Sequence, residues 1–449
     1  MNVTVLADGG RNATAKKSGL SVAALCMFLN LVDGFDLLIV GFVLPNLPKG
    51  FATASEKGLI VSFALVGMAV GAIGLARFAD RYGRRLIALV GGAINIAGLL
   101  LSAISPSAEF MMGTRFLTGV GIGMISVVIV VAAQEAAAPK FRNLATGLVM
   151  IGYPLGSVLA AFSTNAITST FGENWKALYL TGAGLGTIAL IAAFIGLPES
   201  VKAAERTFES EHAAPSLDRK PQALLGASLV IFTVLLCAGY MSVSGVFNFA
   251  AGLTPDFVKG AMVAAIDPDA PKEAVATATT VARTTGQNVG LWMSLGCLLG
   301  GISMATIGLR ISAPRLAAAY STIAVVSMLG FANFFPGAGA PNIWLYVTAV
   351  TVGIGVFGSI SSFSALVPEV YPPTARAKGY GAMLGVGRLG AILAPLISGF
   401  LVNEIGAQKL YNWINILLLV TLACAVGLVV ALRNRDRREM AGASVYPKE

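Results

Sequence analysis

The chain alternates between long apolar runs and short polar connections over nearly all of its 449 residues. Each apolar run has about 20 residues or more, the length that an α-helix needs to cross the hydrocarbon core of a bilayer. None shows the strict apolar–polar alternation of barrel strands. The pattern predicts an all-α membrane protein with twelve transmembrane helices. They are expected at residues 20–47, 56–78, 86–105, 109–133, 143–168, 175–197, 222–252, 284–308, 316–336, 341–366, 377–402 and 410–432.

Two of the connections are longer than the rest. The first is dense in charge and predicts a linker between two six-helix bundles. The predicted organisation is an N-terminal tail at 1–19, a first bundle at 20–198, a linker at 199–221, a second bundle at 222–432 and a C-terminal tail at 433–449. The second long connection, residues 253–283, is expected to form either a cap outside the membrane or a disordered loop.

Composition agrees with the hydropathy pattern. The chain is 56% hydrophobic and 12% charged, against about 25% charged residues in soluble proteins. Its net charge of +9 would fit a nucleic-acid partner, but 22 of the 31 Lys and Arg residues lie on the side of the tails and only 7 on the other side. This bias predicts that both termini are cytoplasmic. No cleavable signal peptide is expected, and no nucleic-acid partner.

The chemistry available inside the spans is narrow. The four cysteines all lie in apolar runs, and the single histidine, His212, lies in the linker. We therefore expect no disulfide, no metal site and no histidine proton relay. With no nucleophile–base pair and no phosphate loop, the chain is not expected to be an enzyme or to need a cofactor.

The first span holds two aspartates, Asp33 and Asp36, in the segment Leu31-Val-Asp-Gly-Phe-Asp-Leu-Leu38. A carboxylate at the centre of a membrane helix costs about 2.5–3.5 kcal/mol, so it is expected to face a bundle interior or a wet cavity and to serve an ion or substrate pathway. Residues three apart share a helix face. Two such carboxylates do not both ionise easily, so one is expected to carry a proton. Which one cycles the proton stays open.

The two halves contain an internal repeat. The pattern Glu-x3-Pro-x2-Arg occurs at a cytoplasmic helix end in each half, followed by two glycines at the same offset. The matching pairs are Glu135/Glu369, Pro139/Pro373, Arg142/Arg376, Gly147/Gly381 and Gly156/Gly390. The repeat predicts duplicated halves of the kind found in transporters. The Glu and Arg residues are expected either to form local ion pairs or to join a cytoplasmic gate.

The connection after the second span, Ala76-Arg-Phe-Ala-Asp-Arg-Tyr-Gly-Arg-Arg85, carries a recognisable motif. Asp80, Arg81, Gly83, Arg84 and Arg85 match the loop signature of the major facilitator superfamily, which the chain resembles over essentially its whole length; Ala76 replaces the leading glycine. The resemblance implies that this loop latches the cytoplasmic side in one transport state. The corresponding loop of the second half, residues 308–315, lacks the aspartate and the glycine, which puts a second latch in doubt.

Two arginines lie inside predicted spans. Arg115, in the fourth, stands where this superfamily often carries an arginine linked to proton coupling; snorkelling toward the outer interface is the alternative. Arg388, in the eleventh, is too deep to snorkel, and its planar fork suits a carboxylate. It is expected to hold either an aspartate of the first span or the carboxylate of a substrate, in alternating states.

The Asp-Gly-Phe-Asp segment with Gly41 and Pro45 resembles the first-helix signature of the aromatic acid:proton symporters. The resemblance implies a bacterial inner-membrane importer of a small, hydroxybenzoate-like acid, driven by protons and functional as a monomer. A proton-coupled exporter and a non-transporting sensor are the alternatives. Polar residues that could line the pocket are Asn30, Tyr153, Tyr240, Asn248, Asn288, Trp292 and Asn333.

Overall fold

The computed structural model describes residues 6–75, 78, 82–138, 141–172, 174–197, 229–336, 341–371 and 375–443. Within these ranges, twelve helices are long and apolar enough to cross a membrane, which confirms the predicted twelve-helix fold. Contacts between residues divide the chain into two compact units, Met1–Leu217 and Asp218–Glu449. The predicted linker at 199–221 lies outside the described residues, so the predicted domain boundaries stay predictions.

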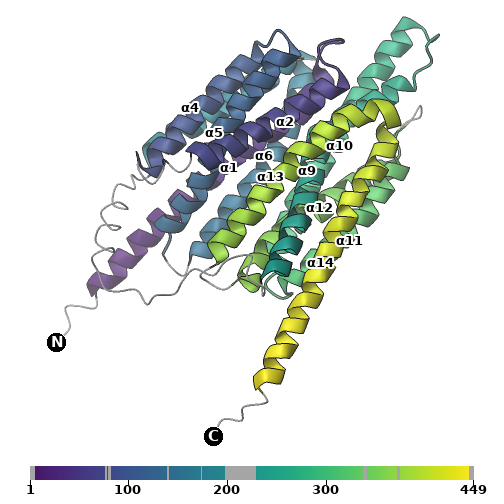
Figure 1. Cartoon of the computed structure of the whole chain (residues 1–449). Coiled ribbons are helices and arrows are strands. Elements are labelled where there is room, and N and C mark those ends of the chain that lie inside the picture. Colours follow the sequence, from purple (N-terminus) through teal and green to yellow (C-terminus); the bar gives the residue numbers. More distant parts are fainter. Residues whose placement is uncertain are drawn as a thin grey trace, which may run out of the picture. The chain divides into compact units, whose positions relative to one another are not determined.

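Within the described residues, the first unit contains six long helices and two short ones; Figure 1 shows their course. They are α1 (Leu6–Val43), the 3₁₀ helix η1 (Leu44–Asn46), α2 (Ala54–Val70), the π-helical turn η2 (Gly71–Leu75), α4 (Arg84–Ala103), α5 (Ala108–Ala136), α6 (Arg142–Phe171) and α7 (Trp175–Gly196). The second unit consists of α9 (Val230–Ala264), α10 (Lys272–Ile307), α11 (Ala313–Asn333), α12 (Ile343–Val370), α13 (Arg376–Ile405) and α14 (Ala407–Ala443).

Local signals explain where several helices begin. Thr53 and Glu56 form a reciprocal capping box at the start of α2, and the side chains of Ser107 and Asn342 accept backbone N–H groups at the starts of α5 and α12. Such caps satisfy amides that have no partner within the helix. Before α4, Gly83 has a φ of 91°, a conformation that favours glycine.

The connection at 253–283 is neither a separate cap nor a disordered loop. Helix α9 continues through Pro255 to Ala264, and α10 already begins at Lys272. The alanine-rich segment after Pro271 favours helix, and a proline just before a first turn is compatible with it. The two spans therefore extend toward each other as long helices.

The two units pack their helices in the same pairwise pattern. In the first unit α1 packs on α6, and α5 packs on both α2 and α4; in the second, α9 packs on α13, and α12 packs on both α10 and α11. The repeated glycines Gly156 and Gly390 have the same role: a Cβ at either position would overlap a backbone carbonyl, of Leu31 on α1 or of Met241 on α9. Small residues allow this close approach of membrane helices.

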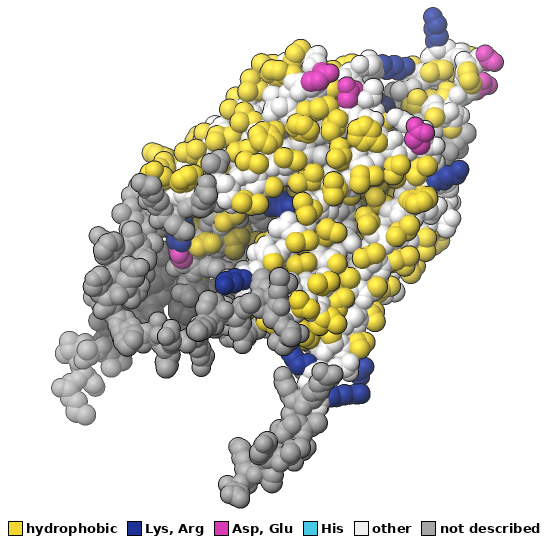
Figure 2. Space-filling model, viewed as in Figure 1, with side chains coloured by type: hydrophobic (Ala, Val, Ile, Leu, Met, Phe, Trp, Pro, Cys, Tyr) yellow, Lys and Arg dark blue, Asp and Glu magenta, His cyan; other side chains and the backbone are white. Residues whose placement is uncertain are grey.

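The outward faces of the helices are strongly apolar. In the described part of Figure 2, hydrophobic side chains spread over the sides of the helices, and residues such as Ile73, Ile195 and Val326 are more than half exposed. A soluble protein rarely exposes so much contiguous apolar surface. The pattern is that of helices surrounded by lipid.

Replacing Gly156 with leucine is expected to separate α1 from α6, because the added side chain meets the backbone of Leu31. Overpacking of this kind costs about 1–3 kcal/mol, so the melting temperature in detergent should fall. The four cysteines are buried, and a thiol-reactive dye would therefore report unfolding. Gly184→Leu is the control, because a Cβ there meets nothing within 4 Å; equal melting temperatures for the two variants would contradict the packing argument.

Candidate functional site

The acidic segment of α1 is joined to α5 by a buried ion pair. Nη1 of Arg115 lies 2.9 Å from Oδ1 of Asp36, and both side chains are fully buried. A second guanidinium nitrogen, Nη2, donates to the backbone oxygen of Asp36 at 3.1 Å. The fork therefore holds both the carboxyl and the backbone of one residue. Arg115 does not snorkel toward the interface, because its guanidinium forms an ion pair with the buried Asp36.

Two residues that we did not select from the sequence complete this pair. Asn95 on α4 lies beside the carboxyl of Asp36, and the ring of Tyr179 on α7 lies 5.8 Å from the Arg115 guanidinium carbon. An arginine over an aromatic face gains cation–π energy, which rises when the pair is desolvated. Both are polar side chains near the middle of apolar helices or within their first turns, and a polar residue in such a run is the signal that could have identified them.

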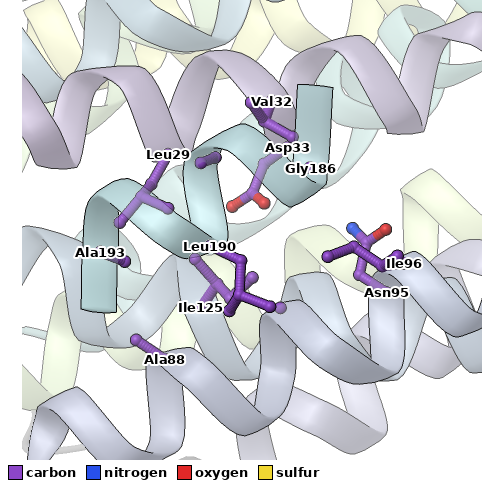
Figure 3. A pocket seen from close by; sticks show the side chains of 12 residues that line it. Leu29, Val32, Asp33, Ala88, Asn95, Ile96, Ile125, Gly186, Leu190 and Ala193 are labelled. Atoms are coloured by element: carbon purple, nitrogen blue, oxygen red, sulfur yellow. The ribbon is translucent and has the colours of Figure 1, made fainter. Parts of the chain in front are cut away.

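Asp33 has different surroundings. It is 2% exposed and borders a small cavity together with Asn95 and apolar side chains of α1, α4, α5 and α7. Figure 3 shows its carboxyl directed into this cavity, with Asn95 on a facing helix. Among the described residues no cation lies within ion-pair distance of Asp33, and its Oδ2 atom has no hydrogen-bond partner. The two aspartates thus share a helix but not a partner.

In the second unit, Arg388 belongs to a cluster with two tyrosines. It is half-buried on α13 and lies close enough to Tyr240 on α9 for its charge to act on that phenol. The Ser364 hydroxyl, on α12, is within hydrogen-bonding reach of both Tyr240 and Tyr380. Tyr240 lies directly against Gly387. A guanidinium beside phenol and serine hydroxyls can bind a carboxylate; Ser364 and Tyr380 were not among the predicted residues.

Three of the other predicted pocket residues, Asn30, Asn248 and Tyr153, make contacts within or between helices. The Asn30 amide donates to the backbone oxygen of Val149 at 2.8 Å and joins α1 to α6. The Asn248 amide donates within its own helix to Ser244 at 2.9 Å. The backbone of Tyr153 lies against Gly34, between the two aspartates. Their predicted roles toward a substrate stay predictions.

At the ends of the helices, the two repeated glutamates have different partners. Arg84, at the start of α4, donates to the carboxylate of Glu135 and forms an ion pair with it. Glu369 instead accepts the backbone N–H of Ala313, at the start of α11, at 3.3 Å. Each glutamate therefore stabilises the beginning of a neighbouring helix, as a negative charge does at a helix N-terminus.

The predicted local pair of Glu369 and Arg376 does not form. Arg376 donates to the backbone oxygens of Tyr371 and Pro368 at 3.1 and 3.2 Å, at the end of α12. Burial raises the pKa of Tyr371, whose hydroxyl donates to Thr233 at 2.9 Å. The predicted gate residues Asp80, Arg81 and the side chain of Arg142 lie outside the described residues.

Comparison with known proteins identifies the fold and its relatives. The model of the Major Facilitator Superfamily matches residues 26–266 and 257–448. The chain is 26% identical to the gentisate transporter of Corynebacterium glutamicum, over 89% of this chain and 83% of that protein. It is 29% identical to the 3-(3-hydroxy-phenyl)propionate transporter of Escherichia coli K12, over 84% and 85%. A D-xylose-proton symporter of known structure superposes with a TM-score of 0.68 at 16% identity, covering 91% and 96% of the two chains.

The buried pair of Arg115 and Asp36 makes a prediction about stability. Arg115→Met leaves the Asp36 carboxylate without its cation, and loss of one partner of a buried pair costs about 3–5 kcal/mol. The melting temperature in detergent should therefore fall, and the double variant Arg115→Met, Asp36→Asn should recover much of the loss. Lys176→Met, which removes an exposed cation, is the control. If the effects of the two single substitutions simply add, the pair is not coupled in the folded protein.

Proposed function

Because the chain belongs to the major facilitator superfamily, we propose that it is a secondary transporter that imports a small aromatic carboxylate together with protons by alternating access. The observation that carries this proposal is the acidic pair of α1, buried at 2% and 0% exposure inside a predicted membrane span. Buried carboxylates in a span mark proton or substrate pathways. The names of the relatives, which are aromatic acid transporters, support the substrate class.

The acidic pair supplies the proton step of this proposal. A carboxyl group in a region without water is retained most easily when it is neutral or when it is held by a cation. Asp36 has Arg115 as its cation, whereas Asp33 borders the small cavity. When one of these carboxyl groups takes up a proton from outside, or loses it to the cytoplasm, its charge changes by one unit. That change is large enough to favour one conformation over another.

Arg388 and its neighbours supply the substrate step. An aromatic carboxylate presents a planar anion, which matches the guanidinium fork, and a ring that packs on aromatic side chains. Tyr240 and Tyr380 are positioned beside this arginine or its neighbour Ser364. We assign the carboxylate to Arg388 and the ring to the tyrosines. No metal or organic cofactor takes part in this proposal.

The ends of the helices supply the gate. The ion pair between Arg84 and Glu135 joins the beginning of α4 to the end of α5, next to the loop that carries the superfamily motif. We assign this end of the first unit to the cytoplasmic side, with both chain termini in the cytoplasm of a bacterial cell and the protein acting as a monomer. Opening to the cytoplasm then requires the contacts of this loop to be released.

Uptake into proteoliposomes tests the proposal directly. With radiolabelled 4-hydroxybenzoate or gentisate as the probe and an imposed proton gradient, acidic outside, the wild-type protein should accumulate one of the acids. An uncoupler should collapse the accumulation, and liposomes without protein are the control. Expulsion of the acid under the same gradient would indicate an exporter, and binding without flux would indicate a sensor; either result would contradict import.

Arg388→Lys should raise the KM for the acid by about tenfold or more with a smaller effect on the melting temperature, because lysine keeps the charge but not the bidentate fork. Lys409→Arg, a charge-conserving change on the exposed start of α14, is the matched control. An unchanged KM for Arg388→Lys would remove this arginine from the substrate site.

A further inference from the structure

Among the buried oxygen atoms of the first unit that have no hydrogen-bond partner in the described residues, three belong to the two aspartates of α1 and to Asn95. They are Oδ2 of Asp33, Oδ2 of Asp36 and Oδ1 of Asn95, and all three residues are at most 4% exposed. An ionised carboxylate and an amide oxygen can only accept hydrogen bonds. Buried polar atoms left without a partner are uncommon in folded proteins and require an explanation. What this group lacks is a hydrogen-bond donor.

The cavity beside Asp33 has the size and the chemistry to hold a small hydrogen-bond donor. The centre of a water molecule can occupy about 20 Å³ of it, so the cavity has room for roughly one water molecule. Its polar lining is Asp33 and Asn95, while small residues such as Gly92, Gly186 and Ala193 leave the space open. All of its lining residues belong to α1, α4, α5 and α7. The cavity is therefore internal to the first unit.

The charges around the two aspartates distinguish them. On α5 the facing charged residue is Arg115, which holds Asp36, and on α7 the facing titratable residue is Tyr179. On α4 the facing polar residue is the neutral Asn95. Arg115 thus balances the charge of Asp36 in place, whereas no cation among the described residues forms an ion pair with Asp33.

We propose that Asp33, rather than Asp36, carries the coupling proton, and that a water molecule in the Asp33–Asn95 cavity delivers and removes it. A hydronium ion in the cavity donates its proton to Oδ2 of Asp33, which leaves a carboxylic acid and a neutral water. That water donates a hydrogen bond to Oδ1 of Asn95 and accepts one from the new carboxylic O–H. On release the water takes the proton back. This inference rests on the proposed proton coupling and names its residue.

The cavity also indicates the direction of the path. Besides Asp33, the cavity is lined by Leu29, which is one helical turn earlier on α1. It is also lined by Ala88 in the second turn of α4 and by Ala193 near the end of α7. These three positions lie toward the end of the unit where α4 begins and α7 ends. The proton therefore moves through the interior of the first unit toward the end that carries the superfamily loop.

Infrared difference spectroscopy of the purified protein tests the assignment without any substrate. A change of pH across the range in which the carboxyl group titrates should produce a protonated-carboxyl band in the wild type. The band should disappear in Asp33→Asn and persist in Asp36→Asn. Loss of the band in Asp36→Asn with retention in Asp33→Asn would overturn the proposal. Because no transported acid is needed, this result is independent of the proposed import.

Transport assays provide the second arm, with whichever acid the wild type accumulates. Asp33→Asn should lose accumulation against a gradient but retain exchange of labelled for unlabelled acid, because exchange needs no net proton release. Gly92→Val should fill the cavity and reduce accumulation at least fivefold while Asp33 is intact. Gly184→Val, on a part of α7 where a Cβ has open space, should leave accumulation unchanged. Full accumulation in Gly92→Val or in Asp33→Asn would contradict the proposal.

Discussion

The absence of water inside a bilayer is the constraint on which this structure depends. A charge placed in a membrane span has no solvent to stabilise it, so its partner must come from another helix of the same bundle. The bond from Arg115 to Asp36 meets this requirement with both side chains fully buried. It also ties α5 to α1. Asp33, three residues away, has no such partner among the described residues and remains available for a proton.

Close helix packing follows from the same constraint. Because lipid is as apolar as the helix surfaces, membrane helices associate through tight contact and hydrogen bonds rather than through the hydrophobic effect. Gly156 and Gly390 allow the backbones of α6 and α13 to touch α1 and α9. These contacts lie beside the residues of interest: Gly156 faces the acidic segment of α1, and Gly390 is two residues from Arg388. The helices that carry the candidate sites are thus held by backbone contact, which leaves little freedom for the side chains between them.

The two units share a fold but differ in their charged chemistry. The first contains the two buried carboxyls of α1 beside Arg115, whereas the second contains buried Asp256 and Arg283 and, at Arg388, an arginine with phenols and a serine beside it. Their repeated glutamates also differ, since Glu135 binds a side chain and Glu369 binds a backbone amide. Arg84 is the first residue of α4, whereas α11 begins with Ala313. The duplicated fold therefore carries different charged clusters in its two units.

The sequence by itself determined the twelve helices, the repeat and the family, because hydrophobic length and motif spacing are local properties of the chain. It also identified Asp33, Asp36, Arg115 and Arg388, since an ionisable residue in an apolar run is visible without a structure. The helical course of residues 253–264 and 272–283 was missed, because Pro255 and the charged residues Asp256, Lys259, Lys272 and Glu273 interrupt the apolar runs. Only the tertiary structure decided that Asp36 binds Arg115, that Asp33 borders a cavity with Asn95, and that Tyr380 and Ser364 join the cluster of Arg388. Pairings of this kind depend on the rotation and depth of each helix, which packing between distant segments sets and a single sequence does not encode locally.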